Sequence, residues 1–209
     1  VDISAHALSI FRSGGGDVLM GSIITRDNAL HMRLKLAHMR LGLGVGMNDV
    51  ELVLRSLPST ALRYHAQDKT ARQLAAALQR QNAVKQLLHP AFASSPGHAH
   101  WQQLCATPEN PAGAAAGIFS VVFDAPQSQV DDFCNRLQLF KLGYSWGGHI
   151  SLVMPYALDE MRDLGRGAVL PGCLVRLCIG LEEAADLERD VAQAYGQAFG
   201  HAWRGQGVH

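Results

Sequence analysis

The chain has 209 residues, 48% of them hydrophobic, which is enough for a substantial core in one large or two small domains. Its 18 basic and 18 acidic residues balance and form no basic run, which argues against nucleic acid or an anionic membrane as a partner. No apolar stretch approaches the roughly 18 residues that span a bilayer, and Val1-Asp2-Ile3 does not resemble a signal peptide, so we expect a cytoplasmic protein.

The first predicted element is a strand over residues 17–25, which is apolar and β-branched and follows the turn Ser13-Gly14-Gly15-Gly16. A glycine run can also cradle a phosphate, but such cradles usually precede a helix, which favours a plain turn here. Asp27 or Asn28 can cap a following helix that ends near residues 42–46. Its apolar positions recur at helical spacing: Leu30, Leu34, Ala37 and Leu41.

A second helical stretch is predicted from Asn48, broken or bent at Pro58. Beyond the proline, apolar residues again recur at helical spacing, which indicates core packing rather than a ligand stripe: Ala71, Leu74, Ala75 and Leu78. We place the domain boundary at Pro58, which gives an amino-terminal part, residues 1–57, and a carboxyl-terminal domain, residues 58–209.

A cluster of histidines, His89, His98 and His100, lies near Cys105 in a stretch rich in proline, serine and glycine. We expect a loop there, without the closely spaced ligand pair of a metal site, so ordinary loop histidines are the favoured interpretation. The cysteines form no CxxC pair, which favours reduced thiols: Cys105, Cys134, Cys173 and Cys178.

The remaining chain alternates between strand and helix patterns. Strands are predicted over residues 84–88, 117–123, 150–154 and 174–179, and helices over residues 127–137 and 182–199. Glu182 and Glu183 are expected in the first turn of the final helix, where they favour the positive end of its dipole. The pattern predicts an α/β fold, with helices covering a mostly antiparallel sheet.

Arg176 is the main candidate for a binding residue. It lies inside the apolar run Leu174–Gly180, where an unpaired charge is costly, so it needs an anion. The residues alone leave two alternatives open: a structural carboxylate, or the carboxylate of a ligand held by the guanidinium fork. The segment Gly143-Tyr144-Ser145-Trp146-Gly147-Gly148 also joins a probable strand to turn-forming residues and is a candidate partner.

Five segments in order resemble the carboxyl-terminal half of the cystathionine β-lyases, in the Cys/Met-metabolism family of pyridoxal-phosphate (PLP) enzymes. They lie within residues 2–21, 48–63, 84–98, 139–152 and 174–180. Tyr-Ser-Trp-Gly-Gly is the sharpest signal, because related γ-synthases and γ-lyases usually carry leucine where Trp146 stands. The resemblance implies the end of a PLP-binding large domain (1–57), then a smaller α/β domain (58–209). Family members carry a further upstream segment of comparable length.

The resemblance also implies roles for individual residues. Arg176 would bind the substrate α-carboxylate, with Ser145 and the Trp146 backbone N–H as supporting donors, and Ser9 would contact the cofactor phosphate. The position of Ile10 is that of the lysine that forms the Schiff base with PLP. Isoleucine provides neither the imine nor the base for the Cα proton, so no catalytic residue is expected at this position.

The implied substrate is cystathionine or another cysteine S-conjugate, cleaved to homocysteine, pyruvate and ammonia by a homo-oligomer, which in the family is a tetramer. Because of Ile10, several interpretations stay open. The chain is a fragment of a lyase, a degenerate relative kept for binding or assembly, or a lyase altered near residue 10. The alternative from a different functional class is an α/β interaction module without catalytic activity.

Overall fold

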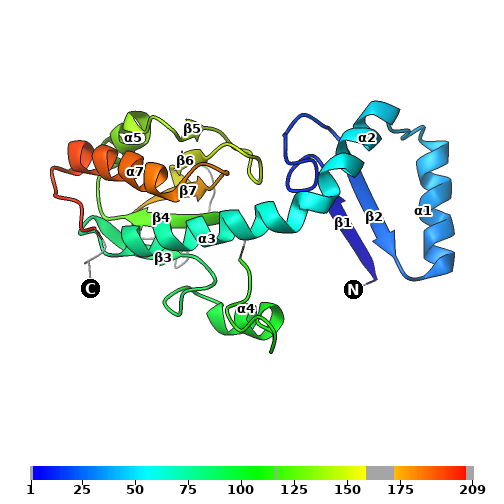
Figure 1. The fold of residues 1–209 in the computed structure, drawn as a ribbon, viewed down its shortest axis with the longest axis horizontal. Helices are drawn as coiled ribbons and strands as arrows, with labels where there is room; N and C mark the ends of the chain where they lie inside the picture. The colour runs from blue at the N-terminus through cyan, green and yellow to red at the C-terminus, as the bar shows by residue number, and fades with distance from the viewer. Residues whose placement is uncertain (1, 116, 159–171, 206–209) are drawn as a thin grey trace. The chain divides into compact units, whose positions relative to one another are not determined.

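The computed structural model describes residues 2–115, 117–158 and 172–205 (Figure 1). The chain divides into two compact units, Val1–Arg63 and Tyr64–His209. This division falls inside helix α3 (Thr60–Gln79), a few residues after Pro58, where we placed the boundary. Among the described residues, no helix combines the length and hydropathy needed to cross a membrane.

The first unit begins with two antiparallel strands, β1 (Ile3–Ala7) and β2 (Gly21–Thr25), paired so that Ile3 lies opposite Thr25. The predicted strand over residues 17–25 is therefore shorter than expected, and β1 was not predicted. Residues 17–20 are not part of the ladder, although Met20 O still accepts a hydrogen bond from Leu8 N at 2.8 Å.

Three helical segments follow in the first unit: α1 (Asn28–Arg40), α2 (Met47–Ser56) and the short 3-10 helix η1 (Leu57–Ser59), which leads into α3. Asp27 caps α1, because its side chain accepts a hydrogen bond from Leu30 N at 2.6 Å. Both predicted helices are confirmed, although α1 ends at Arg40, earlier than expected, and the predicted break at Pro58 is the 3-10 segment η1. Helix α1, however, buries none of its residues, so its apolar positions pack against no core in the described chain.

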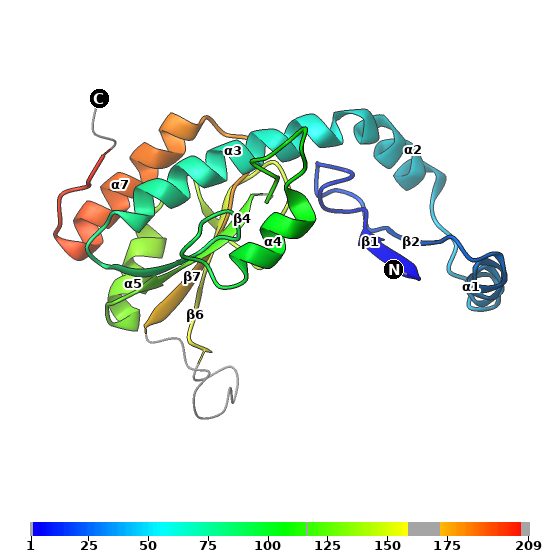
Figure 2. The ribbon, with the colours of Figure 1, turned by 90° about the horizontal axis from the view of Figure 1, so that it is seen from below.

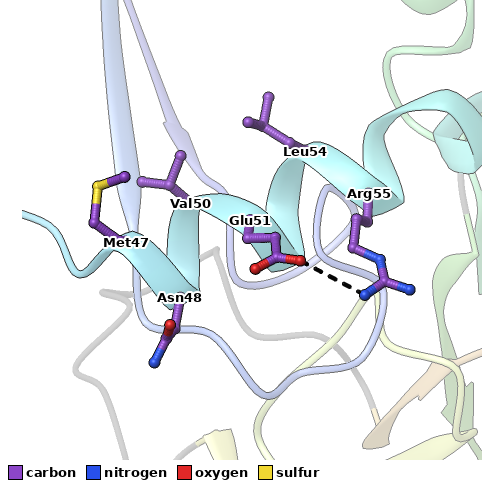
Figure 3. Close-up of a pocket in the computed structure, with 6 residues that line it drawn as sticks. All are labelled: Met47, Asn48, Val50, Glu51, Leu54 and Arg55. Atoms are coloured by element: carbon purple, nitrogen blue, oxygen red, sulfur yellow. Dashed lines mark ion pairs between the residues drawn. The ribbon is translucent and has the colours of Figure 1, made fainter.

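The surface of α2 carries a shallow groove of about 400 Å³, referred to here as the α2 groove. Figure 3 shows the side chains that line it: Met47, Asn48, Val50, Glu51, Leu54 and Arg55. Glu51 and Arg55 form an exposed ion pair at 3.7 Å. Met47 is 82% exposed and Leu54 is 60% exposed, so large apolar side chains of this unit face solvent.

The second unit is built on a five-stranded sheet in the order β3-β4-β7-β6-β5. The strands are β3 (Val84–Leu88), β4 (Ile118–Phe123), β5 (Lys141–Leu142), β6 (Leu152–Tyr156) and β7 (Cys173–Cys178). All pairs are antiparallel except β5 with β6, which confirms the predicted α/β class with a mostly antiparallel sheet. Of the strands described in this unit, the two-residue β5 is the one that was not predicted.

One face of this sheet packs into the core with helices α3, α5 (Gln127–Arg136) and α7 (Ala184–Phe199). Both ribbon views show α3 and α7 running beside the strands (Figures 1 and 2). The core residues of the strands are alternate ones, as expected when successive side chains point to opposite faces. They are Leu87, Phe119, Val121, Phe123, Val153, Val175 and Leu177.

The intervening positions belong to the opposite face of the sheet. Ser120, Arg176 and Met154 are direct partners across β4, β7 and β6, so their side chains lie in one row on that face. Arg176 is half-buried there, in contrast to its completely buried neighbours Val175 and Leu177. The alternation of the strand therefore keeps the charge of Arg176 out of the hydrophobic core.

The stretch around His98 and His100 is helical, so our expectation of a loop there is wrong. Helix α4 (His98–Cys105) starts after Gly97, whose φ of +78° suits glycine, and His98 Nδ1 donates a hydrogen bond to Pro90 O at 2.7 Å. A helix of eight residues has too few turns to display an apolar period. Within the described residues, no group of three or more His, Cys, Asp or Glu side chains could hold a metal ion.

His89 lies directly after β3, outside the helices and strands as the loop interpretation expected, but its side chain is buried. Its ring is completely buried against Phe92, with centroids 5.1 Å apart, and Nδ1 accepts a hydrogen bond from Ala91 N at 3.2 Å. Burial is the main cause that lowers the pKa of His89 from 6.5 to about 4, and the charge of Arg72 lowers it further. The imidazole is therefore neutral in the folded protein at neutral pH.

Acidification should destabilise the protein through His89. As the pH falls from 6.5 towards 4, the unfolded chain takes up a proton at this residue before the folded chain does, so the free energy of unfolding decreases across this window. Urea unfolding at several pH values should show a shallower pH dependence for His89→Asn, whose side-chain oxygen can still accept from Ala91 N. The exposed His100→Asn is the control and should keep the wild-type slope; equal slopes in all three proteins would contradict the assignment.

Candidate functional site

The candidate site centres on Arg176 in β7. Its Nη2 atom donates hydrogen bonds to Gly143 O at 2.9 Å and Ser145 O at 3.1 Å. The guanidinium carbon lies 5.9 Å from the ring centroids of both Trp146 and Tyr156. Three of the residues singled out from the sequence, Ser145, Trp146 and Arg176, are thus brought together by the fold.

The charge of Arg176 has no carboxylate partner among the described residues, where the ion pairs involve other side chains. The two carbonyl oxygens accept hydrogen bonds from Nη2 but carry no formal negative charge. The Nε atom is buried without a hydrogen-bond partner. A half-buried guanidinium in this state attracts an anion. Of the two alternatives left open by the sequence, this geometry favours a ligand anion over a structural carboxylate.

Ser145 contributes to the site through its backbone rather than through its hydroxyl, because its carbonyl oxygen accepts from Arg176. Ser145 is exposed and Trp146 is 41% exposed, so both can meet a ligand from solvent. Tyr144, next to them, packs edge-on against Tyr156 with ring centroids 6.3 Å apart. The site therefore combines a cationic side chain, neighbouring aromatic rings and a loop that is accessible to solvent.

The loop between β5 and β6, Gly143–Ser151, is fixed by side chains that the sequence analysis did not identify as site residues. Gln67 Nε2 donates to Gly148 O at 2.7 Å, and Gly147 N donates to Cys178 Sγ at 3.2 Å. Burial raises the pKa of the Cys178 thiol, so the sulfur is a protonated structural acceptor at neutral pH. No local sequence pattern indicates a contact such as Gln67 to Gly148, which joins positions far apart in the chain.

Glu182 was expected in the first turn of the final helix, and this is wrong. Helix α7 begins at Ala184, with Glu183 at the N-cap position, so Glu182 lies before the helix. Its carboxylate instead accepts hydrogen bonds from the backbone and the hydroxyl of Ser151, at 2.7 and 2.8 Å. These charge-assisted contacts outweigh the weaker attraction of an exposed helix end.

Ser9 and Ile10 lie in the first unit, in the turn before β2. Ser9 O accepts a hydrogen bond from Ser13 Oγ at 3.0 Å, and Ile10 O accepts from Gly14 N at 3.0 Å. Arg63 holds this turn, because Nη1 donates to Phe11 O at 2.7 Å, and a Cβ at Gly14 would lie 2.5 Å from that same nitrogen.

No lysine is present between residues 8 and 16. Ile10 is half-buried in the turn and offers no amine. A cofactor that needs an imine with the protein therefore does not fit the residues of this turn.

Comparison with known proteins agrees with this architecture. Residues 1–196 match the family model described as Cys/Met metabolism PLP-dependent enzyme. A cystathionine β-lyase from Bordetella avium is 35% identical over 199 residues, covering 94% of this chain and 48% of the relative. A cystathionine γ-synthase from Mycobacterium tuberculosis is 30% identical over 196 residues, covering 93% of this chain and 49% of the relative.

The solved structures give the same result. The cystathionine γ-synthase of Xanthomonas oryzae pv. oryzae, in a complex with cystathionine, superposes with a TM-score of 0.81 at 28% identity. That match covers 96% of this chain and 51% of the γ-synthase chain. The present chain thus spans about half the length of the relatives that it matches.

The sheet, its helices and these matches place the chain in the class of α/β folds found in PLP-dependent enzymes. The chain belongs to the Cys/Met-metabolism family of PLP-dependent enzymes, whose members include cystathionine lyases and synthases.

Proposed function

We propose that this chain supplies the substrate-carboxylate site of a carbon–sulfur β-lyase that acts on cystathionine or a similar cysteine S-conjugate. The observation that carries the proposal is the half-buried Arg176, whose charge has no carboxylate partner among the described residues and which lies beside two aromatic rings. A planar guanidinium binds a carboxylate with paired hydrogen bonds, which selects amino-acid substrates over amines.

The choice of β-lyase over the other activities of the family rests on Trp146 and on the cystathionine β-lyase relatives. Two of these, from Bordetella avium and Rhizobium johnstonii, are 35% identical to the chain, compared with 30% for the M. tuberculosis γ-synthase. The exposed indole of Trp146, adjacent to Arg176, is suited to pack against the thioether part of a substrate.

Residue 10 limits what the chain does by itself. PLP chemistry in this family would supply the electron sink for cleavage of the carbon–sulfur bond. With isoleucine at the position that we assign to the cofactor lysine, the chain retains carboxylate binding but lacks the group that attaches PLP and moves the Cα proton. The second candidate function is therefore a non-catalytic relative or interaction module, which the isoleucine specifically favours.

Replacement of Arg176 by alanine should weaken binding of S-methyl-L-cysteine about 10-fold to 100-fold, the loss expected for hydrogen bonds to a charged group. NMR titration of the 209-residue chain measures the affinity. S-Methylcysteamine, which lacks the carboxylate, should bind equally weakly to both proteins. The matched control is Arg136→Ala, which removes an arginine paired with Asp132. Unchanged affinity in Arg176→Ala would contradict the carboxylate site.

The chain should produce no pyruvate from cystathionine when PLP is added, because residue 10 offers neither an imine nor a base. Pyruvate is followed by a coupled assay, and the mass of the intact protein excludes a contaminating lyase. Pyruvate formation that co-elutes with the 209-residue chain in size-exclusion chromatography would refute our assignment of residue 10.

We also propose that the chain forms a homo-oligomer through the exposed apolar surface of the first unit, which includes Met47 and Leu54 in the α2 groove. Light scattering across a wide concentration range should report a mass above that of one chain. Leu54→Glu should shift the protein towards the monomer, whereas Leu104→Glu, at a position on α4 that is even more exposed, should not. A monomer at all concentrations would argue against this surface as an interface.

A further inference from the structure

The loop Gly143–Ser151 supplies both carbonyl oxygens that hold Arg176, and all of it lies outside the strands. A loop of this kind keeps one conformation only where other groups fix it. The side chains that fix this loop therefore influence the position of the guanidinium without touching it.

Glu182 fixes the end of the loop through Ser151. Glu182 Oε1 accepts from Ser151 N at 2.7 Å, Oε2 accepts from Ser151 Oγ at 2.8 Å, and Ser151 Oγ in turn accepts from Gly180 N at 2.9 Å. Ser151 is completely buried, so loss of any of these hydrogen bonds would leave a buried polar group without a partner and destabilise the fold. The three hydrogen bonds join the end of the loop to the chain that follows β7.

The backbones approach closely at this junction. Leu181 N donates to His149 O at 2.9 Å, and a Cβ at Gly180 would lie 2.4 Å from that same oxygen. Glycine at position 180 therefore allows the loop to lie directly against the chain after β7. Arg176 and Glu182 thus sit on the same segment, on either side of the end of β7, and each holds a different part of the loop.

We propose that Glu182 is a positioning residue for the anion site at Arg176. Its carboxylate locks Ser151, and the locked loop presents the Gly143 and Ser145 carbonyls that orient the guanidinium. Because both contacts to Ser151 are charge-assisted, they hold the loop more firmly than neutral hydrogen bonds would. This inference rests on the proposed carboxylate site, but its structural part can be tested without a ligand.

The test compares Glu182→Ala and Glu182→Gln in the 209-residue chain by NMR. In Glu182→Ala, hydrogen exchange at the Ser151 and Gly180 amides should accelerate at least tenfold, and the Arg176 Nε–H resonance should move towards that of an exposed arginine. Affinity for S-methyl-L-cysteine should fall about tenfold. Glu182→Gln keeps one acceptor oxygen, so it should lie between wild type and alanine in all three measurements.

Glu183→Ala is the matched control. It removes the same charge one residue away, from an exposed side chain that makes no capping hydrogen bond. It should leave the Arg176 resonance and the affinity unchanged. Ser151→Ala retains the backbone contact to Glu182 and should loosen the loop less than Glu182→Ala does. It replaces Glu182→Ala in the test if that variant does not fold.

The outcomes separate this proposal from the proposed function. If wild type binds no carboxylate ligand, the proposed function fails, whereas the Arg176 resonance still reports whether Glu182 positions the guanidinium. An unchanged Arg176 resonance in Glu182→Ala or Ser151→Ala would overturn the positioning role. A loosened loop with unchanged ligand affinity would overturn it as well, since Glu182 would then be only structural.

Discussion

The alternation of side chains along β7 is the constraint on which the candidate site depends. Val175 and Leu177 point into the core, so Arg176 between them must point to the other face of the sheet. A shift of one residue in the pairing would place the guanidinium among buried phenylalanine and valine side chains. This would lower the free energy of unfolding by roughly several kcal/mol. The hydrophobic core therefore fixes the position of the charge as firmly as any direct contact does.

Much of the second unit could be predicted because its elements carry strong local signals. The strands around Val121 and Val175 are short, mostly apolar runs, and α7 repeats its apolar residues at helical spacing. Helix α4 was missed because it is short and is surrounded by turn-forming residues. Strand β5 has only two residues, and β1 is defined by its pairing with β2, which no local pattern specifies.

The candidate site shows the same division between local and distant information. Arg176 stood out because a lone charge in an apolar run is expensive, and this signal is present in the sequence itself. Gln67, Cys178 and Glu182 gave no such signal, because their roles arise only when the loop folds back onto α3 and β7. In the first unit, Arg63 similarly holds the turn of Ile10 through backbone carbonyls that are about fifty residues away in sequence.

The row formed by Ser120, Arg176 and Met154 has an evolutionary consequence. These positions contribute no side chain to the main hydrophobic cluster, whereas their immediate neighbours in sequence do. Selection can thus exchange Ser120 or Met154 to reshape the surroundings of the guanidinium with little effect on folding. Within this one sheet, residues that adapt to new ligands and residues that maintain the scaffold alternate along each strand, which lets a common domain diversify among enzymes of different specificity.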